Sequence, residues 1–291
     1  MADNYLEKKM EEHRSGKANR PAVRRTPTGA KPGTINVKFP VRRVFVTGGA
    51  RGIGRAIVAA FCNAGCRVAF CDIDHKAGTA TAQATGSQFH PVDVTDAVAL
   101  DACVQRVIDA WGDIDVLINN VGVGNFGALT ETSIQDFDTV IATNLRPVFI
   151  TSRRLAIHRQ SLAEPNPFGR IINICSTRYK QSEPGTEGYA ASKGGIDALT
   201  HSLMASLAPM RITVNAISPG WIENNNYDSL TEADHVQHPS QRVGRPEDIA
   251  RMCMFLALPD NDFINGQNIV IDGGMTHLMI YHGDHGWKLE K

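Results

Sequence analysis

The chain has 291 residues, with 30 basic and 30 acidic side chains and 42% hydrophobic residues. This length allows one large or two modest domains, and the composition is that of a globular protein, which excludes a chain disordered throughout. No apolar run approaches the roughly 18 residues of a membrane span, and the N-terminus is charged where a signal peptide would be apolar. We therefore expect a cytoplasmic protein that does not bind a membrane.

Positive charge is concentrated at the start of the chain. Residues 1–43 contain eleven Lys or Arg and four Asp or Glu, a net charge of +7 that leaves −7 for the remainder. Such asymmetry can indicate a nucleic-acid or membrane-binding arm. However, the two signs alternate early in this segment, and the Pro/Gly-rich part that follows has no aromatic residues to stack on bases. We predict an N-terminal extension over 1–40 that is loosely structured, has a short helix near 4–14, does not bind nucleic acid, and could pack on a neighbouring subunit.

From residue 43 onward, short β-branched runs alternate with longer helical patterns, which is typical of a parallel sheet covered by helices. The predicted strands are 43–47, 67–71, 88–92, 115–119, 170–175, 212–217 and 268–272, and the predicted helices lie near 52–65, 75–85, 96–111, 134–162, 189–209 and 246–257. Right-handed crossovers then favour an α/β fold in one Rossmann-type domain over 41–276, followed by a tail over 277–291. We expect a doubly wound, seven-stranded parallel sheet with helices on both faces.

The six cysteines lie mostly in apolar runs and form no C-x-x-C pair, so we interpret them as reduced core residues. Cys62 and Cys66 are four residues apart on a predicted helix and could share a metal, but no further ligand has suitable spacing. We therefore predict no metal site.

A glycine-rich turn follows the first predicted strand and contains Gly48, Arg51, Gly52, Ile53 and Gly54. Glycines allow positive φ and let the backbone approach a pyrophosphate, whose charge would meet the N–H groups at the start of the next helix. The spacing G-x-x-x-G-x-G departs from the general dinucleotide pattern, and a glycine turn alone is a weak signal. Its place in a βαβ unit, with an acidic residue 18 positions after Gly54, nevertheless predicts a dinucleotide site.

That acidic residue, Asp72, ends the second predicted strand. A carboxylate there can accept both hydroxyls of the adenosine ribose and repels the extra phosphate of NADP, so NAD is predicted over NADP. Arg51 argues the other way, because an arginine in the turn can stack on adenine or bind a 2′-phosphate. Asp74 is the alternative acid at this strand end, although we expect it to cap the following helix.

Tyr189 and Lys193 are four residues apart, on one face of a predicted helix. A phenol has a pKa near 10, and a cation within about 4–6 Å lowers that pKa by roughly one to three units. This spacing also occurs by chance in many helices, where it has only a structural role. Ser176, thirteen residues upstream, follows an apolar strand at the carboxyl edge where doubly wound folds bind ligands. The three side chains together predict proton exchange with an alcohol.

These motifs, in this order, resemble those of the short-chain dehydrogenase/reductase family over roughly residues 41–276. Further matching segments are Asp93-Val94, 119–122, Asn144, 215–222, 244–248 and 272–274. The resemblance implies an enzyme that transfers a hydride between a nicotinamide and a secondary alcohol or ketone. It also implies a homo-oligomer, a dimer or tetramer, because the family commonly pairs the helices near 134–162 and 189–209.

The resemblance assigns a role to each catalytic candidate. Tyr189 would act as general acid or base, and Ser176 would hydrogen-bond the substrate oxygen. Lys193 would hold the nicotinamide ribose and lower the pKa of Tyr189, while Asn144 would anchor a water that links Lys193 to solvent. The hydride passes directly between substrate and nicotinamide, so the protein contributes placement and electrostatics.

The positions expected to contact the cofactor belong to the glycine turn, the strand ends and the loop after Pro219. They are Gly48, Arg51, Gly52, Ile53, Gly54, Asp72, Asp93, Val94, Asn120, Val121, Gly122, Tyr189, Lys193, Pro219, Gly220, Ile222 and Asn224. Two of them depart from the family pattern. Val121 replaces an alanine and adds bulk, and Asn224 replaces a threonine, although its amide can still donate and accept hydrogen bonds.

Polar residues follow Ser176 and Ile222 and are predicted to shape the substrate pocket. The candidates are Arg178, Tyr179, Glu223 and Tyr227, and the loop up to 243 has few large apolar groups for a steroid or long acyl chain. We expect a small polar alcohol or ketone, such as a sugar or polyol derivative. Each candidate could instead face solvent, and Arg178 could pair either with a substrate carboxylate or with Glu183.

Two other functions stay open. An NADP-dependent 3-oxoacyl reductase is disfavoured by Asp72, and a non-catalytic dinucleotide-binding scaffold is disfavoured by the intact set of Asn144, Ser176, Tyr189 and Lys193. The tail beyond 276 carries an apolar run that could reach a neighbouring subunit's active site.

Overall fold

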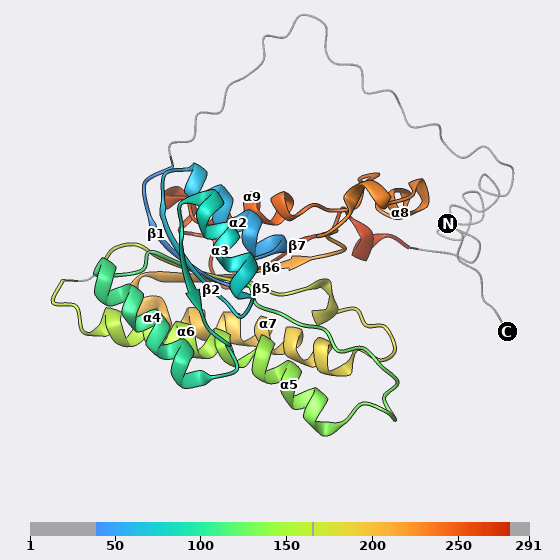
Figure 1. The fold of residues 1–291 in the computed structure, drawn as a ribbon, viewed down its shortest axis with the longest axis horizontal. Helices are drawn as coiled ribbons and strands as arrows, with labels where there is room; N and C mark the ends of the chain where they lie inside the picture. The colour runs from blue at the N-terminus through green and yellow to red at the C-terminus, as the bar shows by residue number, and fades with distance from the viewer. Residues whose placement is uncertain (1–38, 165, 280–291) are drawn as a thin grey trace, which may run out of the picture. The chain divides into compact units, whose positions relative to one another are not determined.

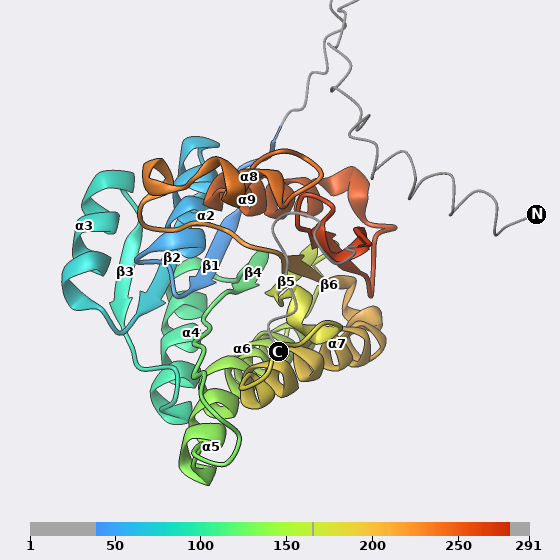
Figure 2. The same ribbon diagram turned by 90° about the vertical axis from the view of Figure 1, so that its right-hand side faces the viewer.

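Seven parallel strands form the central sheet in the order β3-β2-β1-β4-β5-β6-β7 (Figures 1 and 2). The computed structural model describes residues 39–164 and 166–279, so the predictions for 1–38 and 280–291 lie outside the described residues. The strands are β1 (Arg43–Thr47), β2 (Arg67–Asp72), β3 (Gln88–Pro91), β4 (Val116–Asn119), β5 (Gly169–Ile174), β6 (Ile212–Pro219) and β7 (Asn268–Ile271). All seven were predicted to within two residues at each end.

Helices cover both faces of this sheet (Figure 1). One face carries α2 (Gly52–Asn63), α3 (His75–Thr85) and α9 (Pro246–Leu256), and the other carries α4 (Ala97–Trp111), α6 (Arg146–Gln160) and α7 (Glu187–Leu207), with α5 (Ile134–Asn144) packed against α7. The predicted doubly wound α/β fold is therefore confirmed. Among the described helices, none combines the length and the apolar character needed to cross a bilayer.

The core follows from the alternation of side chains along buried strands. Val44 and Val46 of β1 pack with α2 and α9, whereas Phe45 between them packs with α4 on the opposite face. Because both faces are covered, these strands are apolar at nearly every position. All six cysteines are free thiols, and five of them are buried.

The order of the strands positions the site. The chain runs outward from β1 through β2 to β3, then returns so that β4 pairs with the other edge of β1. Loops leaving β1 and β4 therefore diverge at the carboxyl ends of the strands, where open α/β sheets bind ligands. The backbone N–H of Asn120, just after β4, donates to the hydroxyl of Thr47 at the end of β1 (3.0 Å).

The single helix predicted near 134–162 is wrong. The segment forms two helices, because α5 ends at Asn144 and α6 begins at Arg146. Pro147 in the first turn of α6 has no N–H and disfavours a helical conformation at the residue before it. The N–H of Val148 donates to the carbonyl of Leu145 (3.2 Å), one residue short of the α-helical partner.

A short helix, α8 (Glu232–Val236), lies in the segment predicted to be a loop. Its start is a capping box in which the Thr231 hydroxyl accepts from the N–H of Asp234, and the Asp234 carboxylate accepts from the N–H of Thr231. Five residues are too short for a helical period to be recognised in the sequence.

Candidate active site

The turn after β1 is shaped to receive an anion. Gly48 and Gly52 have φ of +70° and +51°, conformations that favour glycine. A Cβ on Gly54 would lie 1.9 Å from the carbonyl oxygen of Gly48. Arg51 at the N-cap of α2 makes no side-chain cap, and the first turn has no acidic residue, whereas Asp74 and Asp96 cap α3 and α4. The first N–H groups of α2 are thus available to a phosphate.

Gly54→Ala tests this turn. The added methyl must displace a backbone carbonyl, so we expect NADH to bind about 5- to 150-fold more weakly, from an overpacking cost of about 1–3 kcal/mol. Titration of NADH fluorescence measures the loss. Gly194→Ala is the matched control, because nothing lies within 4 Å of its added Cβ. Equal affinities for the two variants would contradict a cofactor role for the turn.

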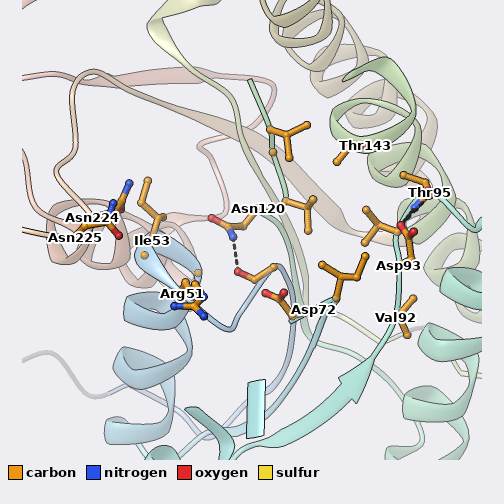
Figure 3. Close-up of a pocket in the computed structure, with 18 residues that line it drawn as sticks. Arg51, Ile53, Asp72, Val92, Asp93, Thr95, Asn120, Thr143, Asn224 and Asn225 are labelled. Atoms are coloured by element: carbon orange, nitrogen blue, oxygen red, sulfur yellow. Dashed lines mark hydrogen bonds between the residues drawn. The ribbon is translucent and has the colours of Figure 1, made fainter. Parts of the chain in front are cut away.

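A cavity of about 570 Å³ extends from this turn across the ends of β1, β2 and β4. Figure 3 shows Asp93 and Thr95 on one side of it, Asn224 and Asn225 on the other, and Asn120 and Asp72 between them. Twelve of the residues predicted to contact the cofactor line it: Gly48, Arg51, Gly52, Ile53, Gly54, Asp72, Asp93, Val94, Asn120, Val121, Gly122 and Asn224. The structure therefore gathers the predicted positions around one elongated cavity.

Asp72 and Arg51 are both held in place at the ribose end of this cavity. The Asp72 carboxylate accepts the N–H groups of Ala50 and Asp74, each at 3.0 Å. Arg51 donates through Nε and Nη2 to Oδ2 of Asp74 (2.9 and 2.6 Å). Asp74 also caps α3 by accepting the N–H of Ala77 (2.9 Å), as predicted. The capping bond, followed by the ion pair, lowers the pKa of Asp74.

A second cavity, of about 280 Å³, continues from the first and shares Ile53, Asn120, Gly122 and Asn224 with it. Its further lining comes from α7 and from the segments that end or follow β4, β5 and β6. It includes Tyr189, Lys193, Pro219, Gly220 and Ile222, which complete the predicted cofactor set, together with Ser176. The catalytic candidates thus adjoin the crevice that was predicted to bind the dinucleotide.

The Tyr189–Lys193 pair is more buried than the sequence suggests. The Lys193 ammonium lies 5.4 Å from the centroid of the Tyr189 ring, but it donates to the carbonyl of Ile174 in β5 (3.0 Å). Burial lowers the pKa of Lys193 to about 8. Burial also raises the pKa of Tyr189, against the opposing effects of a hydrogen bond with Ser176 and the charge of Arg178. The groups that lower the pKa of Tyr189 here are Ser176 and Arg178, and the effect of Lys193 on the phenol stays a prediction.

Asn144 links the loop after β4 to α7. Its amide donates to the carbonyl of Val123 (2.9 Å) and the hydroxyl of Ser192 (3.0 Å), and its Oδ1 accepts the N–H of Val123 (2.8 Å). Both amide hydrogens are thus used within the protein. A water near Lys193 would have to bind another atom of this residue, such as its backbone carbonyl at the end of α5.

Comparison with known proteins agrees with this geometry. The profile of the family described as "Enoyl-(Acyl carrier protein) reductase" matches residues 48–276. An uncharacterized oxidoreductase of Thermotoga maritima is 41% identical over 250 residues, which are 81% of this chain and 96% of that protein. This chain belongs to the short-chain dehydrogenase/reductase family.

Other members of the family differ in what their names say they act on. A 3-oxoacyl-(acyl-carrier-protein) reductase of Chlamydia pneumoniae is 35% identical over 84% of this chain and 100% of its own. A sorbitol dehydrogenase of Cereibacter sphaeroides is 32% identical over 80% of this chain and 96% of its own. The solved structure of an apo SCOR enzyme from Clostridium thermocellum superposes with a TM-score of 0.77 at 40% identity, over 86% of this chain and 99% of that one.

A third cavity, of about 390 Å³, adjoins the second one at the predicted catalytic residues Ser176 and Tyr189. It shares Phe126, Ser176, Tyr189 and Gly220 with the second cavity. Its remaining lining is Thr177, Arg178, Gln181, Glu183, Trp221, Gln237, Asp272, Met275 and Thr276. The two hydroxyls that were predicted to act on the substrate therefore lie where a cofactor-side cavity and a polar outer cavity meet.

Several lining residues of this outer cavity were missed in the sequence. Phe126, 63% exposed, meets the Tyr189 ring edge to face with centroids 5.7 Å apart. Met275 and Thr276 come from a 3₁₀ turn after β7, and the carbonyl of Thr276 accepts from Gln181 (3.4 Å). These residues lie on loops, where no periodic pattern signals a contact.

Of the four predicted substrate residues, only Arg178 lines this outer cavity. Tyr179 packs against the core cluster that contains Val148 and Ile196. Glu223 accepts the N–H groups of its own turn (2.8 and 3.1 Å), and the Tyr227 hydroxyl donates to the carbonyl of Val243 (2.8 Å). The structure does not bring these three side chains to the reactive hydroxyls.

Proposed function

We propose that this protein is an NAD-dependent dehydrogenase that interconverts a secondary alcohol and a ketone on a small polar, sugar- or polyol-like substrate. One observation carries the proposal: Ser176 and Tyr189 line both the cavity that adjoins the dinucleotide crevice and an outer cavity, whose lining combines charged and amide side chains with apolar ones. A substrate in the outer cavity would place its reacting carbon between these hydroxyls and the crevice.

The chain's residues would move one proton while a hydride leaves the substrate carbon. In the oxidative direction the Tyr189 phenolate accepts the hydroxyl proton, and Ser176 hydrogen-bonds the oxygen as it becomes a carbonyl. When bound, NAD would supply the acceptor for the hydride. Lys193, with a pKa of about 8, can exchange a proton near neutral pH at a position adjacent to Tyr189. Reduction reverses these transfers.

The preference for NAD rests on the ribose end of the first cavity. Asp72 presents a carboxylate there, and like charges at short range repel a 2′-phosphate. Arg51, the cation that could bind that phosphate, pairs with Asp74, but this pair is exposed and weak, so the preference rests on Asp72. The fixed backbone of the turn, the uncapped start of α2 and this carboxylate all fit NAD.

Asp72→Ser tests the preference. We expect the wild type to have a higher kcat/KM with NAD than with NADP, and the variant to lower that ratio at least tenfold, because a repelling charge and a ribose acceptor are both lost. Asp96→Ser is the matched control, since Asp96 does not line this cavity and caps α4, a role that serine can also fill. A wild type that prefers NADP would refute the assignment.

A 3-oxoacyl reductase is the second candidate, because the Chlamydia pneumoniae relative carries that name and is similar along its whole length. The charged and amide side chains in the lining of the outer cavity and the sorbitol dehydrogenase relative favour the first candidate. NADH formation with polyols and sugars, compared with NADH or NADPH consumption with an acetoacetyl thioester, separates the two.

We also propose a homo-oligomer, a dimer or tetramer, located in the cytoplasm. Exposed apolar side chains on α5 and α6, such as Ile134, Phe137 and Phe149, would be covered by another copy. The catalytic domain would comprise 41–276, flanked by the extension over 1–40 and the tail over 277–291. Light scattering of the intact protein reports the assembly.

A further inference from the structure

The outer cavity has a single basic side chain among its lining residues, Arg178. Arg178 shares this cavity with Tyr189. Its backbone is held in a 3₁₀ turn (Thr177–Tyr179), and its N–H donates to the Ser176 hydroxyl (3.2 Å). A cation thus lies in the same cavity as the phenol that is proposed to exchange the substrate proton.

Two acidic residues share this cavity, and they differ in how firmly they are held. Both oxygens of Asp272 are bound by the chain, through the N–H groups of Gly274 and Thr276 (2.8 Å each). Glu183 pairs with Arg178, but its side chain is 64% exposed, whereas that of Arg178 is only 28% exposed. Both oxygens of Asp272 are therefore bound by its own turn, whereas Glu183 pairs with Arg178 at the exposed edge of the outer cavity.

The Arg178–Glu183 pair can open without disturbing the fold. Ion pairs with an exposed partner contribute about 0–1 kcal/mol, so exchange for another carboxylate costs little. The backbone of Glu183 is fixed separately, because its carbonyl accepts the hydroxyl of Thr186 (2.7 Å). Rotation of the Glu183 side chain would free Nη2 of Arg178, and the guanidinium could then bind another carboxylate through two N–H groups.

We propose that Arg178 binds a carboxylate of the substrate in place of Glu183, so that the substrate is a polyhydroxy acid or its keto form rather than a neutral polyol. The inference rests on the proposed dehydrogenase function and adds the charge of the substrate. The neighbouring amides of Gln181 and Gln237 would serve its hydroxyl groups.

The test compares acids with neutral polyols of the same carbon chain: D-gluconate with D-glucitol, D-galactonate with galactitol, and D-mannonate with D-mannitol. Binding to the full-length protein with NADH is measured by calorimetry, and turnover with NAD by absorbance. We expect at least one acid to bind tenfold more tightly than its polyol. Arg178→Met should lower that ratio at least tenfold, and Glu183→Gln should tighten binding of the acid about threefold by removing a competitor.

Lys180→Met is the matched control. It removes a positive charge two residues from Arg178, and the Lys180 side chain lies over the Tyr179 ring and does not line the cavity. We expect its acid-to-polyol ratio to stay within twofold of the wild type. The inference fails if no acid is preferred, if Arg178→Met weakens acid and polyol equally, or if Glu183→Gln weakens the acid. If the protein binds acids more tightly than polyols but forms NADH from neither, the proposed dehydrogenase function is contradicted, whereas the anion site at Arg178 is supported.

Discussion

Tyr189→Phe is expected to lower kcat by more than 100-fold while the Kd of NADH stays within threefold. The variant loses only the hydroxyl that exchanges the substrate proton, and positioned acid–base groups contribute about 10²–10⁴-fold. The ring remains, together with its edge-to-face contact with Phe126 and the position of Lys193 near its face. Single-turnover absorbance at saturating substrate measures the chemical step, and NADH fluorescence measures binding.

Tyr179→Phe provides the matched control for this change. It removes the same atom from a tyrosine ten residues away. Tyr179 packs against the core cluster that contains Val148 and Ile196 and does not line the second or the outer cavity. Its kcat should stay within threefold of the wild type. A Tyr189→Phe enzyme that kept a tenth or more of wild-type kcat would assign the proton transfer to another group.

The parts of the site that the sequence predicted are those determined by local chemistry. Gly48 and Gly52 require positive φ, and Gly54 requires the absence of a side chain, so glycine stands at each position. The strands alternate with helices because buried parallel sheets need apolar runs and long crossovers. Once the strand order is fixed, Asp72 and Ser176 follow their strands at the same edge of the sheet.

The parts that the sequence did not predict depend on contacts between distant segments. Phe126, Gln237 and Met275 come from three separate loops and meet only in the folded chain. The pattern showed Lys193 beside Tyr189 but not the carbonyl of Ile174 that the ammonium binds, nor the burial that raises the pKa of the phenol. Burial is a tertiary property that a helical spacing does not reveal.

Lys193→Met is expected to abolish most activity and to change how stability depends on pH. We expect kcat/KM to fall more than 100-fold, because the ribose contact and the proton exchange next to Tyr189 both disappear. At pH 7 the wild-type protein buries an ammonium whose pKa is lowered to about 8, so burial of this charge lowers the free energy of unfolding. Removing it should raise the Tm by a few degrees, since about 1 kcal/mol corresponds to 2–4 °C at this size. Loss of the hydrogen bond to Ile174 offsets part of the gain.

The sign of the pH dependence follows from the direction of the shift. Between pH 8 and the ordinary lysine value near 10.5, the unfolded wild-type chain binds more protons than the folded one, so wild-type stability rises with pH relative to the variant. The Tm advantage of Lys193→Met should therefore be largest below pH 8 and shrink toward pH 10. Calorimetric Tm values across this range measure it, with Lys180→Met, a surface change, expected to give a constant difference. A difference for Lys193→Met that stayed constant with pH would show that the ammonium is solvated, and the proton exchange assigned to Lys193 near neutral pH would then lose its physical basis.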